Sequence, residues 1–151
     1  MEADSFAGIQ GIEMDTDEVD AFLRSQGFGV LSLARDGEAY GIPISFGYDG
    51  TQLYFVLLRP GARSKKEEFV RETDTASFLV YDVGDKHDWQ SVVVTGRLEP
   101  VGDDDWPALR DAIEENAWFP SLFSETQPMQ DILGWRLVVD EMTGQRSHDA
   151  P

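Results

Sequence analysis

The residues best placed to do chemistry are four consecutive ones, Arg63-Ser64-Lys65-Lys66, in a chain with a formal net charge of −17. Three of them are basic, and the chain has only one other lysine, Lys86. Ser64 followed by Glu67 fits the capping-box pattern S-x-x-E, which predicts a helix with both lysines in its first turn. Lysines are unfavourable there because the dipole makes a helix N-terminus partly positive. A bound anion reverses that penalty, because backbone N–H groups, dipole and lysines then all face one negative group.

An ordinary surface role fits this local sequence equally well. In that case solvent and the neighbouring carboxylates of Glu67 and Glu68 balance the charge of the two lysines. The local sequence leaves both interpretations open, so the choice depends on the elements around the stretch.

Other catalytic groups are scarce. His87 and His148 are the only histidines, and both lie in polar segments, which favours surface positions over a base or a metal ligand. The chain has no cysteine, which excludes disulfides, thiolate nucleophiles and cysteine-ligated metals. HExxH, GxSxG, Walker and GxGxxG motifs are also missing, and no metal site is expected. If the protein is an enzyme, we expect a bound cofactor to supply the chemistry.

The composition predicts one folded domain with a strongly acidic surface. Of the 151 residues, 41% are hydrophobic, 29 are acidic and 12 are lysine or arginine. Such a surface repels nucleic acid and anionic membranes, so neither is an expected partner. The acidic N-terminus does not resemble a signal peptide, and the apolar runs are too short to cross a bilayer, which predicts a cytoplasmic protein.

The high net charge also has a consequence for stability. Like charges repel in the compact state unless salt screens them. We therefore expect a halophilic protein from a high-salt cytoplasm, which would lose its fold on dialysis to low salt.

Hydrophobic patterning and turn signals predict the elements around the basic stretch. A helix is expected to open at residues 15–18 and to stop at Gly27. Two Asp-Gly turn signals predict a three-stranded meander, and Pro43 favours an edge position or a bulge in its second strand. The expected strands of the meander are residues 28–34, 39–48 and 52–58. The basic stretch then begins a helix directly after the third strand.

The second half of the chain continues the pattern, and the whole predicts a mainly β fold, a six-stranded antiparallel barrel with flanking helices. The apolar run Val92 to Val94 indicates burial on both faces, as in a barrel that dimerises through its sheet. Further strands are expected at residues 76–81, 89–101 and 134–142, and a helix at residues 103–116. The expected organisation is an N-terminal arm (1–14), one domain (15–143) and a C-terminal tail (144–151), with an aromatic loop at residues 118–130.

The order of these segments, together with the basic stretch, resembles the pyridoxamine 5'-phosphate oxidase-like family of FMN-binding split barrels, here in an acidic form of the haloarchaeal type. The resemblance covers residues 19–144. It rests on a helix followed by FGVLSLA, and then on DGEAYGIPISF, LYFVLLRPGARSKKEEF, ASFLVY, and WQSVVVTGRLEPV with the late WRLVVDEMTG. It implies a six-stranded FMN-binding split barrel that forms a homodimer, with the flavin at the subunit interface.

The resemblance also implies which residues hold the cofactor. FMN is expected, with FAD, a deazaflavin or haem as less favoured alternatives. The phosphate would be held by Arg63, Ser64, Lys65 and Lys66, although the register leaves open which lysine contacts it. The residues implied to line the flavin are Ile42, Pro43, Ile44, Phe55, Val56, Trp89, Gln90 and Ser91.

The C-terminal region departs from the pattern of true pyridoxamine phosphate oxidases. That pattern has tryptophan, arginine and histidine residues that bind the substrate. In this chain Trp135-Arg136-Leu137 matches it only weakly. The resemblance therefore implies an FMN-binding oxidoreductase with hydride transfer through flavin N5 and an unknown small-molecule substrate or electron donor. Two alternatives are a non-catalytic flavin- or haem-binding protein that stores or senses its ligand, and an interaction protein without a ligand.

Overall fold

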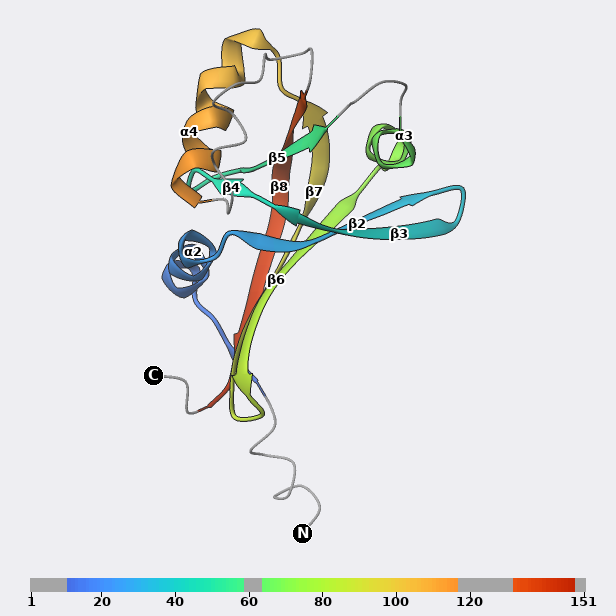
Figure 1. Ribbon diagram of the computed structural model, residues 1–151. Helices are drawn as coiled ribbons and strands as arrows, with labels where there is room; N and C mark the ends of the chain where they lie inside the picture. Colours follow the sequence, from blue (N-terminus) through green and yellow to red (C-terminus); the bar gives the residue numbers. More distant parts are fainter. Residues whose placement is uncertain (1–10, 59–63, 117–131, 149–151) are drawn as a thin grey trace.

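The described part of the chain, residues 11–58, 64–116 and 132–148 of the computed structural model, is built on one antiparallel sheet (Figure 1). Hydrogen-bonded neighbours follow the order β3-β2-β6-β7-β8-β5-β4, and β1 pairs with β8. The eight strands are β1 (Ile12–Glu13), β2 (Phe28–Arg35), β3 (Glu38–Ser45), β4 (Gly47–Tyr48), β5 (Leu53–Leu58), β6 (Ala76–Asp85), β7 (Asp88–Pro100) and β8 (Ile132–Arg146). The predicted mainly β class is confirmed.

The sheet closes into a barrel at Phe46. This residue separates β3, which pairs with β2, from β4, which pairs with β5, so one stretch of chain forms both ends of the strand order. The Phe46 side chain is fully buried, and its backbone N–H donates to the Gly27 carbonyl at 3.2 Å. The break at Phe46 and the short strand β1 account for eight strands where six were expected.

The predicted three-stranded meander is wrong in one respect. β2 and β3 form the expected hairpin, and the end of the expected second strand, now β4, pairs with β5 at Gly47↔Tyr54 and Tyr48↔Leu53. The rest of β5 does not continue this pairing: the strand pairs with β8 along its whole length, from Leu53↔Leu137 to Leu58↔Ile132. Turn signals fix where the chain reverses, whereas the partner of the next strand depends on contacts with a segment some eighty residues away. Among the described strands, the partner of β3 is β2 alone, so the predicted edge position of Pro43 on β3 is confirmed.

Three helices flank the barrel in the described part of the chain: α2 (Thr16–Ser25), α3 (Lys65–Glu72) and α4 (Trp106–Asn116), the last preceded by the 3-10 turn η1 (Asp103–Asp105). Asp15 caps α2 because its carboxylate accepts from the Glu18 N–H at 2.8 Å, while Glu18 accepts from the Asp15 N–H. α4 packs over β4 and β5, and α3 packs against β2 (Figure 1). None of the helices within the described residues is long and apolar enough to cross a membrane.

The barrel interior is filled by aromatic and aliphatic side chains. Phe78 contacts Phe46 and Phe55 edge-on, with ring centroids 5.1 and 4.9 Å apart. Burial of such large side chains is the main favourable term in folding, and edge-to-face pairs add to it. A second, smaller cluster lies between the sheet and α4 and includes Tyr54, Trp106 and Leu109.

The C-terminal strand is longer than the sequence indicated. Gln145 and Arg146 pair with β7 and with β1, so these residues belong to the sheet and not to the expected tail. Ser147 then exchanges two hydrogen bonds with Trp89, each between 3.0 and 3.1 Å. The strand was hidden because its last residues are polar, and its backbone partners lie far away in the sequence.

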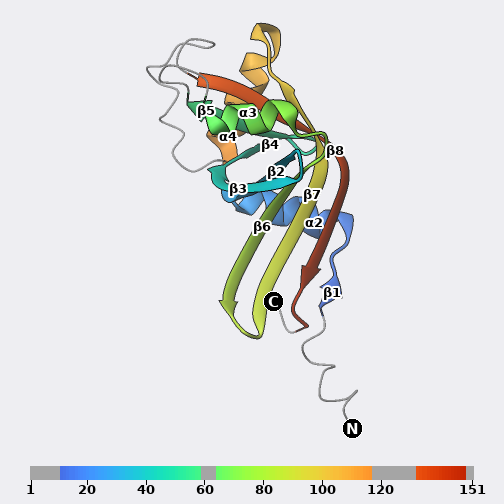
Figure 2. The same ribbon diagram turned by 90° about the vertical axis from the view of Figure 1, so that its right-hand side faces the viewer.

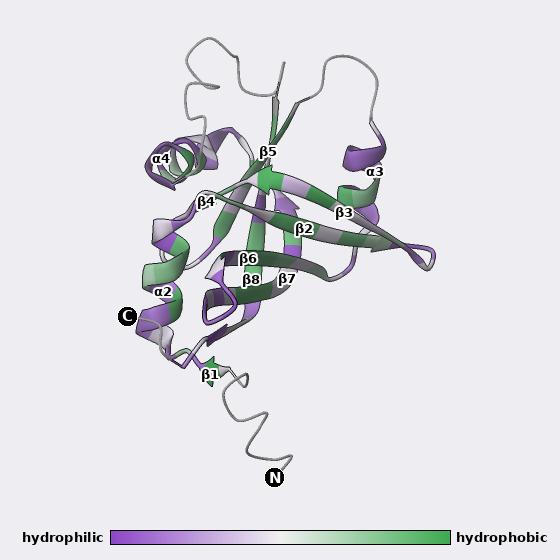
Figure 3. Cartoon of the chain, turned by 60° about the horizontal axis from the view of Figure 1, so that its bottom comes forward, coloured by the Kyte–Doolittle hydropathy of each residue, from purple (hydrophilic) through white to green (hydrophobic). Residues whose placement is uncertain are grey.

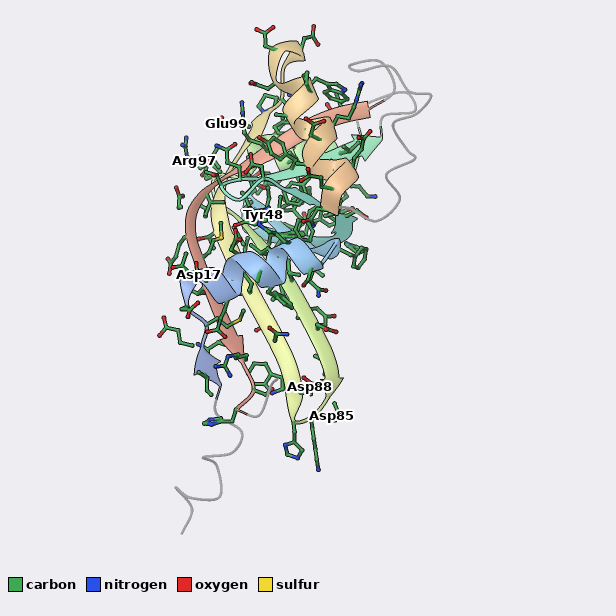
Figure 4. The ribbon with its side chains drawn as sticks, turned by 90° about the vertical axis from the view of Figure 1, so that its left-hand side faces the viewer. Asp17, Tyr48, Asp85, Asp88, Arg97 and Glu99 are labelled. Atoms are coloured by element: carbon green, nitrogen blue, oxygen red, sulfur yellow. The ribbon has the colours of Figure 1, made fainter. Side chains whose placement is uncertain are left out.

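The β6–β7 hairpin extends beyond the body of the barrel (Figure 2). Residues 82–85, which follow the end of the expected strand at residue 81, continue β6 as far as the tip, where Asp85 and Asp88 pair (Figure 4). The hairpin therefore extends the sheet surface well past the helices.

Candidate functional site

Ser64, Lys65 and Lys66 of the basic stretch lie at the start of α3, as the capping signal predicted. The Ser64 hydroxyl oxygen accepts from the Glu67 N–H at 3.2 Å, so Ser64 is the N-cap. The Lys65 and Lys66 N–H groups, by their position in the first turn, have no partner within the helix. The reciprocal half of the predicted capping box is replaced: the buried Glu67 carboxylate pairs with Arg71 Nε at 3.0 Å.

The two lysines have different surroundings. The Lys65 ammonium lies 4.9 Å from the centre of the Tyr40 ring and 5.7 Å from that of Phe69, and its Nζ is 3.5 Å from Glu38 Oε2. Lys66 is exposed, and within the described residues the structure shows no carboxylate paired with it. Both lysines are exposed, and they differ in that Lys65 has a carboxylate partner at the surface.

Arg35 adds a second cation next to α3, but it is already neutralised. Its Nη1 atom lies 2.7 Å from Glu72 and 3.4 Å from Glu68, and its guanidinium stacks over Phe69. These contacts tie the β2–β3 hairpin to the helix and leave the Arg35 charge matched by two carboxylates.

The outer face of the sheet carries exposed apolar side chains. Val30, Leu79 and Val93 are cross-strand neighbours, and paired residues point to the same face of a sheet. Figure 3 shows the hydrophobic character along β2 and β3, with hydrophilic residues at their turn. We call this surface the outer apolar face; its most exposed large members are Phe28 (41%), Tyr81 (55%), Val83 (60%) and Val93 (38%).

The outer apolar face and the start of α3 lie at opposite ends of β2. Lys65 at the start of α3 pairs with Glu38, which lies opposite Arg35, whereas the register of β2, β6 and β7 puts Ser91 level with Phe28. The two ends are roughly 23 Å apart at about 3.3 Å per residue. Within one chain, the Trp89–Ser91 segment is thus remote from the basic stretch, as the two views in Figures 1 and 2 also show.

A cleft lies beside α2. This cleft of about 640 Å³ has an apolar floor with Met14, Val19 and Met142 and an acidic rim with Asp15, Asp17 and Asp20. Tyr48 lines it from β4 (Figure 4). Its carboxylates fit the generally acidic surface of the chain.

One polar network in this cleft fixes α2 to the barrel. Tyr48 Oη donates to Asp20 Oδ1 at 2.8 Å, and Arg24 Nε donates to Asp20 Oδ2 at 2.9 Å. The bond from Arg24, followed by that from Tyr48, holds the pKa of Asp20 below its ordinary value. Burial, and then the nearby Asp20 carboxylate, raises the pKa of Tyr48 far above its usual range.

The Asp20 network makes stability sensitive to acid. A carboxyl group whose pKa is lowered on folding stabilises the fold above its unfolded pKa, near 3.8, and loses that contribution as the pH falls further. We expect Asp20→Asn to destabilise the protein by roughly 0.5 kcal/mol at neutral pH, because the pair is partly exposed. The difference should shrink in acid. Urea unfolding across pH checks this, with Asp111→Asn on α4 as the control; a pH-independent difference for Asp20→Asn contradicts it.

The comparisons with known proteins identify the family. The sequence matches the family described as pyridoxamine 5'-phosphate oxidase over residues 15–146. The chain belongs to this family. An uncharacterized protein from Rhizobium meliloti (strain 1021) is 25% identical over 135 residues, which cover 89% of this chain and 83% of that protein.

Solved structures share the fold of this pyridoxamine 5'-phosphate oxidase family member. A FAD-binding protein from Mesorhizobium loti superimposes with a TM-score of 0.74 at 22% identity, covering 91% of this chain and 98% of that one. A FAD and heme binding protein from Mycobacterium smegmatis has a TM-score of 0.66 at 19% identity, covering 91% of this chain and 73% of that one. At these identities the likeness establishes the split-barrel fold.

The residues that the family resemblance implied as flavin contacts do not all lie on one side of the sheet. Ile42 and Phe55 are 4% and 1% exposed and fill the barrel core, and Ile44 packs against that core. Val56 packs against the α4 cluster. Contact between these side chains and a flavin remains a prediction, whereas their packing is observed.

The remaining implied residues are more accessible. Pro43 is exposed on the outer face, and Trp89 and Ser91 are half-buried on the same face. Gln90 points the other way and pairs with Arg146 and Asp82 in the sheet. Arg63 lies outside the described residues, as does the loop at 118–130.

Sequence reasoning missed the residues that surround Lys65. Glu38, Tyr40 and Arg35 come from the β2–β3 hairpin, and only the folded chain brings them to α3. Part of the outer apolar face could have been found from the period-2 pattern of β6, where Leu79 and Tyr81 alternate with the core residues Phe78 and Val80. Among the described residues, no cluster of three or more His, Cys, Asp or Glu side chains is arranged to hold a metal ion.

Proposed function

We propose that this protein is a flavin-binding oxidoreductase, with FMN as the cofactor and a small molecule as substrate or electron donor. One observation carries the proposal: a Ser-capped helix start with two adjacent exposed lysines, in a chain of the pyridoxamine 5'-phosphate oxidase family. The structural neighbours from Mesorhizobium and Mycobacterium, named as FAD-binding and as FAD and heme binding proteins, support a flavin over other phosphate-bearing ligands.

The residues at the start of α3 fit a phosphate. Lys66 supplies an exposed cation, and the first-turn N–H groups supply donors that the helix itself does not use. Ser64 stabilises this turn through its bond to Glu67. A phosphate at this position meets the positive end of the helix dipole, so the electrostatic penalty of two adjacent lysines is relieved.

The outer apolar face fits a planar ring and a second copy of the chain. Exposed apolar groups such as Tyr81, Val83 and Val93 are unusual for a surface this acidic, and their burial favours association. A second copy on this face could bring its own Trp89–Ser91 segment to the α3 start of the first. The homodimer would then complete a site that one chain leaves divided.

A bound flavin supplies hydride- or electron-transfer chemistry that the side chains of this protein do not have to provide. The role of the chain is to hold the phosphate at α3, to shelter the ring against the sheet and to exclude water by dimerisation. A non-catalytic flavin-binding protein would need the same residues, so repeated turnover with a donor and an acceptor is the property that distinguishes the two roles.

Ligand identification and reduction test the proposal. We expect the purified protein, kept at high salt because of its charge, to show flavin absorption and to release FMN that mass spectrometry identifies. We also expect a nicotinamide or deazaflavin donor to reduce the bound flavin, and an acceptor to reoxidise it repeatedly. No flavin, even after titration with FMN, overturns the proposal; bound flavin without turnover favours the non-catalytic role.

A further inference from the structure

We infer that the Asp36-Gly37 turn is a site of spontaneous isoaspartate formation, that the other Asp-Gly pair, Asp49-Gly50, is protected, and that the modified turn loosens α3. The inference does not depend on a bound flavin. It rests on how the fold treats two identical dipeptides, the only two Asp-Gly pairs in the sequence.

Isoaspartate formation needs a free carboxyl group and an unhindered backbone nitrogen. The nitrogen of the following residue attacks Cγ of the protonated aspartate, the carboxyl hydroxyl leaves with the amide proton as water, and a five-membered imide forms. Water then adds to one of the two imide carbonyls and opens the ring. Opening at the main-chain carbonyl leaves a chain that runs through Cβ and Cγ. Glycine favours the attack because it has no Cβ atom to obstruct it.

The reacting groups of Asp36 and Gly37 are both free. The two residues are exposed, and among the described residues the Asp36 carboxylate has no hydrogen-bond or ion-pair partner. Arg35 and Glu38 pair with each other across the turn, so the Gly37 N–H lies outside the strand ladder. A Cβ atom built on Gly37 would meet nothing within 4 Å, so water has access. The backbone rotation that the reaction requires needs only local opening of an exposed turn.

The Asp49 carboxylate, in contrast, is held at both oxygens. Its Oδ1 atom accepts from the Thr51 N–H at 2.8 Å and from the Gln52 N–H at 2.7 Å. Its Oδ2 atom accepts from the hydroxyl of the buried Tyr54 at 3.1 Å. A carboxyl group that turns toward the Gly50 nitrogen must break several of these bonds at once, and each of them opposes the reaction.

The modification reaches α3 because the residues on either side of the turn hold this helix. Isoaspartate adds one atom to the main chain, and a two-residue turn has no room for it without a change of geometry. Arg35 pairs with Glu72, the last residue of α3, at 2.7 Å, and Glu38 pairs with Lys65, the first residue, at 3.5 Å. A distorted turn therefore loosens the helix at both of its ends.

Peptide mapping of aged protein tests the difference between the two sites. Folded protein is incubated at high salt, digested, and analysed by mass spectrometry that separates aspartyl from isoaspartyl peptides. We expect isoaspartate to accumulate about ten-fold or more faster at Asp36 than at Asp49, because hydrogen bonds protect Asp49 alone. In the chain unfolded by urea the two rates should agree within about two-fold, since both sites are Asp-Gly.

Three results overturn the inference: equal rates at the two sites of the folded protein, a ratio that unfolding leaves unchanged, or no isoaspartate at Asp36 in the time that converts the unfolded chain.

Asp36→Glu separates the modification from other effects of ageing. Its side chain would have to close a six-membered imide, which forms far more slowly. Aged wild-type protein should lose about 2 °C or more of its thermal midpoint, in proportion to the isoaspartate at position 36, and the α3 amides should exchange hydrogen faster. Aged Asp36→Glu should match its own fresh sample in both quantities. An equal loss in Asp36→Glu, or unchanged α3 exchange in the converted wild type, overturns the link to α3.

Discussion

If the protein forms the proposed homodimer, Val93→Asp should convert it to a monomer and lower its flavin affinity by about 100-fold or more. Val93 lies near the middle of the outer apolar face, between Leu79 and Thr143 in the sheet register, and is 38% exposed. If a second copy covers this face, the new carboxylate would be buried without a partner. A two-fold axis doubles the penalty, because each subunit brings the same charge to the interface.

The measurement combines molar mass from light scattering with an FMN titration, both at high salt. Because Val93 points away from the core, the variant should keep the circular dichroism spectrum of the wild type. Ala108→Asp, which adds the same charge to an exposed position on α4, is the control and should remain dimeric. A Val93→Asp protein that stays dimeric with wild-type FMN affinity would show that the interface and the site lie elsewhere.

The local parts of this fold could be predicted from the sequence because local interactions determine them. Asp15 and Ser64 were recognised as helix starts since a cap and its acceptor lie within one turn of each other. The Asp36-Gly37 turn can be predicted because an Asp-Gly pair is one of the few that tolerate positive φ angles at both positions. The structure shows these angles, 49° at Asp36 and 80° at Gly37.

The long-range parts could not be predicted in the same way. Closure of the barrel at Phe46 and the pairing of β5 with β8 depend on which distant segments bury each other, which no local pattern encodes. The same holds for the candidate site. The basic stretch is visible in the sequence, but Glu38 and Tyr40 reach Lys65 only through the packing of the β2–β3 hairpin on α3. The residues that distinguish the two lysines were therefore hidden until the fold was known.

Gly96→Ala is expected to cost about 3 kcal/mol or more in the free energy of unfolding. Gly96 lies where the register between β7 and β8 shifts, after Thr95. A Cβ atom here would overlap the Val138 carbonyl oxygen and lie 2.9 Å from its carbonyl carbon. These are backbone atoms of the neighbouring strand, so a rotamer change offers no relief, and the two strands must move apart.

Chemical denaturation at high salt measures this effect, and Gly102→Ala provides a matched control. Gly102 has a φ of −82°, which alanine adopts readily, and a Cβ added there would meet nothing within 4 Å. Its substitution should change the stability by less than about 0.5 kcal/mol. Equal stabilities for the two variants would show that β7 and β8 do not approach each other as closely as the bulge requires. β7 also carries Trp89, Ser91 and Val93. The folded fraction of a Gly96→Ala protein should therefore bind flavin less tightly than the folded wild type does.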